Sequence, residues 1–340
     1  MHSDRADTWL KGIIQQRMQV AKFHGKVLKR PKTHGRPLLH PQGIEREYIA
    51  FVSRLMVQIY DAGNLPHLLP SGHQDAAPAG WEQALHRMES TWQELFETQG
   101  GNTLAMVHSF GDDIEHWNEA QWLKKLKPWV GEQFYPPGSA MCKQAVGVWA
   151  KTNFELIKTM GQKEIVDLNT RMQDLVKSGA SARDIRKGVE AMGEQYRGWR
   201  AERLARDQAG KLVGSLTKTR SLAAGVEMYR WRGVLDARER ATHVAMEGML
   251  RTWNSGIYPG EEIMCRCTAE PELDPIWTEC ETDVYGKPMT TENPESRYNP
   301  SPQYSPHRPF TAVSPPLLAA RCPATKCRRL ATPPPLRALN

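Results

Sequence analysis

The chain has 340 residues, enough for one large domain or two modest ones, and its hydrophobic content of 40% is ordinary for a globular protein. No apolar run approaches the roughly 18 residues that a membrane-spanning helix needs, and the N-terminus lacks the pattern of a secretory signal. Six scattered cysteines make a poor disulfide framework and suit a reducing cytoplasm. We therefore expect no membrane partner.

The net charge of +7 is concentrated near the N-terminus. Residues 1–46 hold ten Lys or Arg and three acidic residues, whereas the other 294 residues hold 35 of each sign. We interpret residues 1–46 as a basic arm that neutralises DNA phosphates or an acidic partner surface. A solvated, partly disordered leader is the alternative. The candidate DNA contacts in this arm are Lys26, Lys29, Arg30, Lys32 and Arg36.

Apolar periodicity predicts a helical N-terminal region over residues 47–149. An amphipathic helix is expected within residues 1–30 and a second one over 45–63, ending at Gly63. Pro and Gly then mark a loop. Residues 81–99 form a further predicted helix, which Gly100 and Gly101 close.

The middle third has the most regular helical pattern. Residues 153–179 bury one face, and Gly179 fits a C-cap. Ser181 and Asp184 resemble a capping box that opens the next helix. A third helix follows and carries a basic stripe, which is either a DNA contact or simply a solvated helix face. The stripe consists of Arg200, Arg203, Arg206 and Lys211.

The pattern changes to strands after Gly225. Residues 226–231 alternate, with Tyr229 and Trp231 assigned to a core, and residues 249–253 and 265–271 are two further strand candidates. Residues 273–340 hold 13 of the 24 prolines and are predicted to be a disordered tail, either native or altered by a frameshift. The predicted class is α+β: a mainly helical N-terminal and middle region, a small α+β C-terminal module and a disordered Pro-rich tail.

Residues 199–271 combine a basic helix, an aromatic strand and a Cys-Arg-Cys motif in a particular order. This order resembles the C-terminal signature of the phage Mu protein F-like head morphogenesis family, with a likeness that extends over residues 150–272. The matching positions are Arg206-Asp207-Gln208, Lys211-Leu212, Gly225-Val226, Tyr229, Trp231, Asp236, Arg238, His243, Gly248, Pro259-Gly260 and Cys265-Arg266-Cys267.

The resemblance implies a minor capsid protein of the phage head. Such a protein associates with the portal and with capsid or scaffold proteins, and acts in procapsid assembly and in DNA packaging or ejection. It implies a protein of the virion, present in the bacterial cytoplasm during assembly, encoded by an active phage or by a decayed prophage, and not an enzyme. The alternatives are a nonspecific double-stranded DNA-binding protein and a thiol- or metal-dependent enzyme.

The resemblance also implies a zinc site. In the family, the stretch that matches Asp236 to Gly248 often contains Cys-x-x-Cys, and two more cysteines come from Cys-Arg-Cys. Here Arg240 stands at the first cysteine position and His243 at the second. The chain therefore offers His243, Cys265 and Cys267, with the fourth ligand missing or replaced by Asp236, Glu239 or water.

Other interpretations of these residues stay open. The thiols and the imidazole could pack in a small core without metal, or Cys265 or Cys267 could act as a nucleophile beside His243. The arginines of Asp236-x-Arg238-x-Arg240 could contact a phosphate or carboxylate; alternatively, an ion pair between Asp236 and Arg238 would hold the turn before His243. The structural motif is expected to comprise Asp207, Trp231, Arg238, Gly248, Pro259, Gly260 and Arg266.

Overall fold

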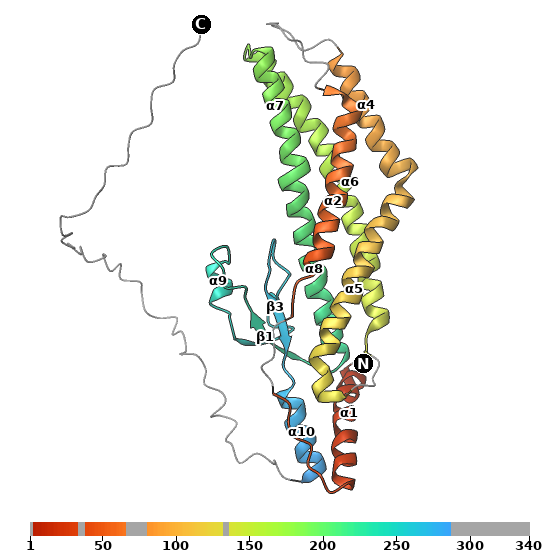
Figure 1. Ribbon diagram of the computed structural model, residues 1–340, viewed down its shortest axis with the longest axis vertical. Coiled ribbons are helices and arrows are strands. Elements are labelled where there is room, and N and C mark those ends of the chain that lie inside the picture. Colours follow the sequence, from red (N-terminus) through yellow and green to blue (C-terminus); the bar gives the residue numbers. More distant parts are fainter. Residues whose placement is uncertain (1–2, 33–37, 66–79, 132–135, 287–340) are drawn as a thin grey trace, which may run out of the picture. The chain divides into compact units, whose positions relative to one another are not determined.

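The computed structural model describes residues 3–32, 38–65, 80–131 and 136–286, which are mainly helical with one small sheet. The predicted α+β class with a small C-terminal module is confirmed. Among the described helices, none is long and apolar enough to cross a membrane. A bundle (Figure 1) is formed by α2 (Gln42–Gly63), α4 (Trp81–Gln93), α5 (Gly100–Val130), α6 (Ser139–Lys177), α7 (Ala182–Gln195) and α8 (Ala201–Ala223).

Aromatic side chains fill the core of this bundle. The Tyr48 ring on α2 lies with its centroid 5.1 Å from that of Phe110 on α5 and 5.7 Å from that of Trp149 on α6. Trp92 of α4 covers Gly161 of α6, where an added Cβ would lie 2.2 Å from the indole ring. The missing side chain at Gly161 therefore lets the two helices approach closely. Burial of each such ring stabilises the fold by about 2–3 kcal/mol.

The predicted helix over residues 81–99 ends differently from our expectation. After α4 the chain continues through a π-helical segment, η1 (Glu94–Thr98). Gly100 does not close the helical stretch, because it is the first residue of the next helix, α5. An added Cβ at Gly100 would lie 3.4 Å from Phe154, so this glycine lies at a packing contact. A second π-helical segment, η2 (Tyr196–Arg200), joins α7 to α8. Such segments change the register of a helix without breaking its backbone hydrogen bonds.

Two helix ends follow the sequence closely. The Ser181 hydroxyl accepts a hydrogen bond from the backbone N–H of Asp184 at 3.2 Å, which confirms the predicted N-cap of α7. Helix α6 ends at Lys177, and Gly179 adopts a φ of +70° just beyond it. A left-handed residue in this position is typical of a helix C-terminus.

The basic N-terminal segment is not separate from the fold, and the predicted boundary at residue 46 is wrong. Helix α1 (Ser3–Phe23) packs against α5 and against α10 (Asp274–Tyr285). Its apolar face is completely buried together with Trp122 and Trp277. The buried residues on α1 are Leu10, Ile14 and Met18.

The predicted Pro-rich tail begins too early. Residues 274–285 form α10, in which Pro275 lies in the first helical turn, where its missing N–H costs nothing. Trp277 and Cys280 of α10 are fully buried, and Lys11 of α1 pairs with Glu279 at 3.3 Å. Residues 287–340, the rest of the predicted tail, lie outside the described residues.

The C-terminal module contains a three-stranded antiparallel sheet in the order β2-β1-β3. Strand β1 (Met228–Arg232) lies between β2 (Leu250–Thr252) and β3 (Thr268–Pro271), so all three strand predictions are confirmed. Tyr229 and Trp231 are completely buried, as the alternation predicted. Gly248, with a φ of +73°, donates its N–H to Trp231 O at 2.9 Å and turns the chain into β2.

A buried carboxylate fastens the sheet to the bundle. Glu270 of β3 is 4% exposed and accepts a hydrogen bond from Arg232 of β1 at 2.7 Å. The ammonium group of Lys125 on α5 pairs with the other oxygen of the same carboxylate. Both oxygens of Glu270 are therefore neutralised, one from the sheet and one from the bundle.

Candidate metal centre

The loop between β2 and β3 rests on α8 with backbone against backbone. An added Cβ on Gly214 would lie 2.3 Å from Pro259 O, and one on Gly210 would lie 3.1 Å from Cys265 O. Gly260 has a φ of +94°, and a Cβ there would lie 2.5 Å from Gly210 O. Three glycines therefore allow this contact, because any side chain would separate the two backbones.

Polar contacts hold the end of the same loop. Asp207 on α8 accepts the backbone N–H of Met264 at 2.8 Å and pairs with Lys211 at the same distance. Met264 has a left-handed φ of +58°, which turns the chain toward the Cys-Arg-Cys motif. His40, whose pKa is lowered by burial, lies with Nε2 2.8 Å from Arg266 O. The helix and loop halves of the motif thus form one packing unit.

The docked loop ends at two thiols that meet the imidazole of His243 on α9 (Ala241–Val244). His243 Nδ1 lies 3.7 Å from Cys265 Sγ and 3.4 Å from Cys267 Sγ, and the three side chains are 2 to 5% exposed. All three ligand atoms lie within 4.8 Å of one another. A tetrahedral zinc ion, with Zn–S of about 2.3 Å and Zn–N of about 2.0 Å, would separate sulfur from nitrogen by about 3.6 Å. The donor set therefore fits zinc.

A carboxylate orients the imidazole. His243 Nε2 lies 2.6 Å from Glu262 Oε2, and the ring packs edge-on against Trp231 with centroids 5.2 Å apart. An ionised carboxylate only accepts hydrogen bonds, so we assign the ring proton to Nε2. The lone pair of Nδ1 then faces the two thiols, as in metal sites where a carboxylate supports a histidine ligand.

The two thiols differ in acidity. Hydrogen bonds from Cys267 and from the backbone N–H of Gly260, at 3.3 Å, lower the pKa of Cys265 to about 6. Cys267 has its pKa raised by the neighbouring sulfur and by burial, and its Sγ lies 3.2 Å from Glu239 Oε1. Metals bind thiolates, so a lowered pKa at Cys265 favours the form of the side chain that binds a metal.

Asp236, the fourth ligand candidate, does not join the three donors. Arg266 donates to both oxygens of its carboxylate, at 2.6 and 2.7 Å, and this ion pair holds the pKa of Asp236 well below its usual range. The Arg238 guanidinium lies 3.4 Å from Asp236 and is 75% exposed. The expected pair between Asp236 and Arg238 is present, but Arg266 makes the shorter contacts.

Sequence patterns did not single out Glu262, Gly210 or Gly214. The two glycines stand four residues apart on one helix, and this spacing is a usable signal for close backbone approach. Glu262 has no comparable signal, because its role depends on a contact with His243, 19 residues away.

The predicted basic stripe, which lies on η2 and α8, is mostly neutralised by nearby carboxylates. Arg206 bonds Glu45 at 2.8 Å, and Lys211 pairs with Asp207. Arg200 lies 3.8 Å from Asp167. The Arg203 guanidinium lies 5.2 Å from the centroid of the Trp199 ring. The stripe thus offers fewer free cations than its sequence implies.

The candidate DNA contacts near the N-terminus differ in their exposure and pairing. The side chains of Lys26, Lys29 and Lys32 are exposed. Arg30 instead pairs with Asp274 of α10 at 2.9 Å. Arg36 lies outside the described residues.

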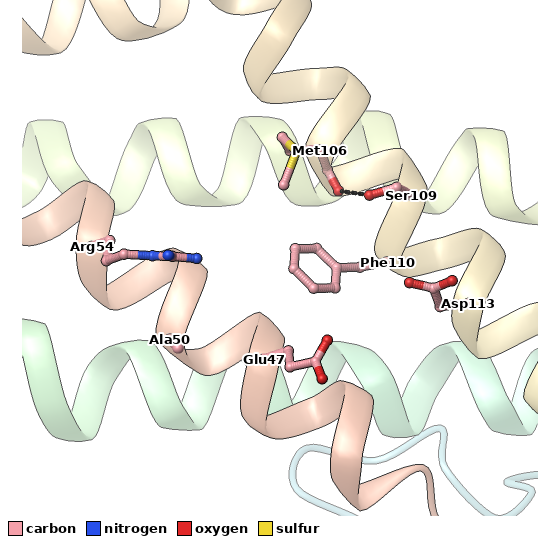
Figure 2. A pocket seen from close by; sticks show the side chains of 7 residues that line it. All are labelled: Glu47, Ala50, Arg54, Met106, Ser109, Phe110 and Asp113. Carbon is pink, nitrogen blue, oxygen red and sulfur yellow. Dashed lines mark hydrogen bonds between the residues drawn. The ribbon is translucent and has the colours of Figure 1, made fainter.

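A separate hollow of about 440 Å³ lies between α2 and α5 (Figure 2). Figure 2 shows the Phe110 ring at its centre, with the Arg54 side chain on one side and the Asp113 carboxylate on the other. Its lining contains no thiol and no imidazole, so the metal centre lies elsewhere. The lining residues are Glu47, Ala50, Arg54, Met106, Ser109, Phe110 and Asp113.

Comparison with known proteins finds a family match in one segment of the chain. Residues 167–270 match the family described as Phage Mu protein F like protein, a range that contains α8, β1, β2, all of β3 except Pro271, and the three candidate metal donors. The chain is also similar to an uncharacterized protein of Haemophilus influenzae, with 26% identity over 196 residues. The alignment covers 56% of this chain and 44% of the Haemophilus protein, so the chain spans less than half of that relative. No solved structure matches the chain.

Proposed function

Because residues 167–270 belong to the phage Mu protein F-like family, we propose that the chain is a minor protein of the phage head. In this proposal it acts in head morphogenesis, binds the portal together with capsid or scaffold proteins, and is carried in the virion. The observation behind it is that the family segment forms one docked unit, in which α8 and the loop at Pro259 and Gly260 meet through glycines. A unit of this kind suits a structural role, since its surface keeps a fixed shape.

A surface for a protein partner supports the proposal. The segment between β1 and β2 carries four apolar side chains that are 45 to 60% exposed, and Figure 1 shows its helix α9 lying apart from the bundle. An exposed apolar patch is typical of protein–protein contacts, and we propose that these side chains form one. We call this surface the α9 tip; it consists of Val234, Leu235, Val244 and Met249.

Co-expression with the cognate portal and capsid proteins tests this function. After sedimentation of the particles through a gradient, we expect a few copies of the chain in particles that contain the portal and none in particles without it. If the chain remains at the top of the gradient as free protein in both cases, the head assignment is wrong.

Contact with double-stranded DNA during packaging or ejection is a second candidate function. Three exposed lysines, Lys26, Lys29 and Lys32, stand in a stretch from residue 8 to 44 that contains no acidic residue. Replacing all three by Gln should reduce the slope of log affinity against log salt by about 2–3. The matched control replaces three exposed lysines of α6 by Gln: Lys143, Lys151 and Lys177. Equal slopes for both variants would exclude the N-terminal lysines from DNA contact. Deletion of residues 1–46 is unsuitable because it would remove α1 from the core.

We also infer that the Cys–His centre binds zinc and that the ion stabilises the module instead of catalysing a reaction. His243, Cys265 and Cys267 are almost completely buried, so a substrate has no direct access to them. The full chain should contain one equivalent of zinc, and Cys265→Ser should lose the metal and lower the melting temperature. Unchanged melting and no zinc in the wild-type protein would support simple packing of the thiols.

A further inference from the structure

A closed structural zinc site takes four donors, and the Cys–His centre supplies three. The fourth must be a nearby side chain or water. Three carboxylates lie around the centre, belonging to Asp236, Glu239 and Glu262, and each makes different contacts. These contacts decide which carboxylate is available.

Two of the three carboxylates are engaged elsewhere. Both oxygens of Asp236 accept hydrogen bonds from Arg266, at 2.6 and 2.7 Å, so Asp236 would have to break an ion pair to reach a metal. Glu262 contacts Nε2 of His243, whereas the thiols face Nδ1 of the same ring. Glu262 therefore orients a ligand without reaching the metal position itself.

Glu239 contacts one of the two thiols. Its Oε1 atom lies 3.2 Å from Cys267 Sγ, close to the roughly 3.5 Å that separates an oxygen ligand from a sulfur ligand on a tetrahedral zinc ion. We propose that Glu239 is the fourth ligand, which gives a site of two thiolates, one imidazole and one carboxylate. This proposal rests on the zinc site inferred above.

The backbone before Glu239 holds its carboxylate in this position. The N–H of Leu235 donates to Oε2, and the left-handed φ of Leu235, +59°, belongs to the turn that presents this donor. An added Cβ on Gly233 would lie 2.3 Å from Oε1, so the missing side chain leaves the space that the carboxylate occupies. One oxygen is thus anchored by the backbone, and the other lies against the thiol of Cys267.

Arg240, the residue after Glu239, makes contacts with the loop that carries the thiols. Arg240 donates from its guanidinium to Ile263 O at 2.5 Å and lies 3.7 Å from Glu262. It therefore ties α9 to the loop that carries the thiols. The metal donor and the loop anchor stand at adjacent positions, Glu239 and Arg240.

Metal affinity of the full chain tests the role of Glu239. Zinc affinity is measured by competition with a chromophoric chelator for the wild type, Glu239→Gln and the control Glu261→Gln. Glu261 precedes Glu262 on the loop between β2 and β3, where its carboxylate accepts the backbone N–H of Tyr258 at 3.1 Å. We expect Glu239→Gln to weaken binding by about 100-fold or more and the control to change it less than about threefold.

Two more variants separate ligation from a structural effect. Glu239→Cys should keep the metal and, with cobalt in place of zinc, strengthen the thiolate-to-cobalt absorption, because a third thiolate joins two. Gly233→Ala should weaken binding by displacing the Glu239 carboxylate. In the Glu239→Gln background, Gly233→Ala should have no further effect.

The outcomes distinguish the two proposals. If the wild-type chain binds zinc and Glu239→Gln binds it equally tightly, Glu239 is not a ligand and the zinc site stands with another fourth donor. If the wild-type chain binds no zinc, the zinc site itself is wrong. If Glu239→Gln fails to fold, the cobalt spectrum of Glu239→Cys decides: a spectrum with the wild-type thiolate intensity overturns the assignment.

Discussion

The helical bundle and the C-terminal module are stabilised in different ways. Large apolar side chains from several helices meet in the bundle, as Tyr48, Phe110 and Trp149 do. The module, residues 225–271, has a small aromatic core around Trp231 and adds glycine contacts, buried ion pairs and the Cys–His centre. A short segment buries too little apolar surface to be stable alone, so it depends on its polar contacts and on docking to α8.

This difference predicts which substitutions destabilise each region. In the bundle, the loss of one ring removes contacts with many neighbours, and its cost follows the buried area. In the module, stability depends on single atoms. An added Cβ, or the loss of one hydrogen-bond acceptor, disturbs a contact that no other contact replaces. The ion pairs of Glu270 contribute mainly by fixing how the sheet meets α5, since buried charges repay their desolvation only in part.

The largest effect is expected in the bundle for Trp92→Ala. Trp92 is 2% exposed and also donates its indole N–H to Lys158 O at 3.0 Å. Its removal leaves a cavity over Gly161 and should lower the free energy of unfolding by about 3–5 kcal/mol. Trp199→Ala is the control, because that ring is 54% exposed and should cost less than about 1 kcal/mol. Equal losses in denaturant unfolding would contradict the packing assigned to the bundle.

The second prediction concerns pH and a carboxyl group inside the bundle. Glu164 of α6 is fully buried, and burial raises its pKa to about 8 from an ordinary value of 4.5. The charged and titratable groups around it are Tyr60 of α2, Arg197 and Arg200 of η2 and Asp167 of α6. Between these pH values the folded chain keeps a proton that the unfolded chain releases, so stability falls as pH rises from about 4.5 to 8.

Glu164→Gln should remove this pH dependence. The wild type is expected to lose on the order of 3 kcal/mol of unfolding free energy between pH 5 and 8 that the variant does not lose. Denaturant unfolding of both proteins across this range measures the difference. Parallel pH profiles would show that Glu164 does not titrate as assigned.

The third prediction addresses how the module docks. Gly214→Ala puts a Cβ 2.3 Å from Pro259 O and should cost about 1–3 kcal/mol, since neither backbone can move freely. Amide hydrogen exchange should increase in the loop and in β3 while the bundle core stays protected. Gly147→Ala on α6 is the control: a Cβ there meets nothing within 4 Å and should be neutral or slightly stabilising. The same exchange pattern in both variants would exclude the docking contact.

The smallest effect on stability is expected at the α9 tip. Val244→Glu changes an exposed side chain and should alter the free energy of unfolding by less than about 0.5 kcal/mol. It should nevertheless reduce incorporation into portal-containing particles, since a carboxylate resists burial in an apolar contact. Val166→Glu is the control, because Val166 is 62% exposed on α6, away from the tip. Normal incorporation of Val244→Glu would move the partner contact to another surface.

Local features were predictable from the sequence because they depend on neighbours along the chain. Alternation assigned Tyr229 and Trp231 to a core, and Ser181 capped α7 as its spacing to Asp184 predicted. The same logic failed at Trp277, whose helix stands in a Pro-containing stretch and is stabilised by α1, more than 250 residues earlier.

Most helices and the three strands could be predicted from the sequence, because backbone propensity and hydrophobic period act over a few residues, whereas the three candidate metal donors came from the family resemblance. The sequence cannot distinguish Asp236, Glu239 and Glu262, which are chemically alike; in the tertiary structure they differ in their partners. Those partners are Arg266, Cys267 and His243, each 19 to 30 residues away from its carboxylate. The type of residue therefore does not show which carboxylate contacts a thiol; the packing of the β2–β3 loop does.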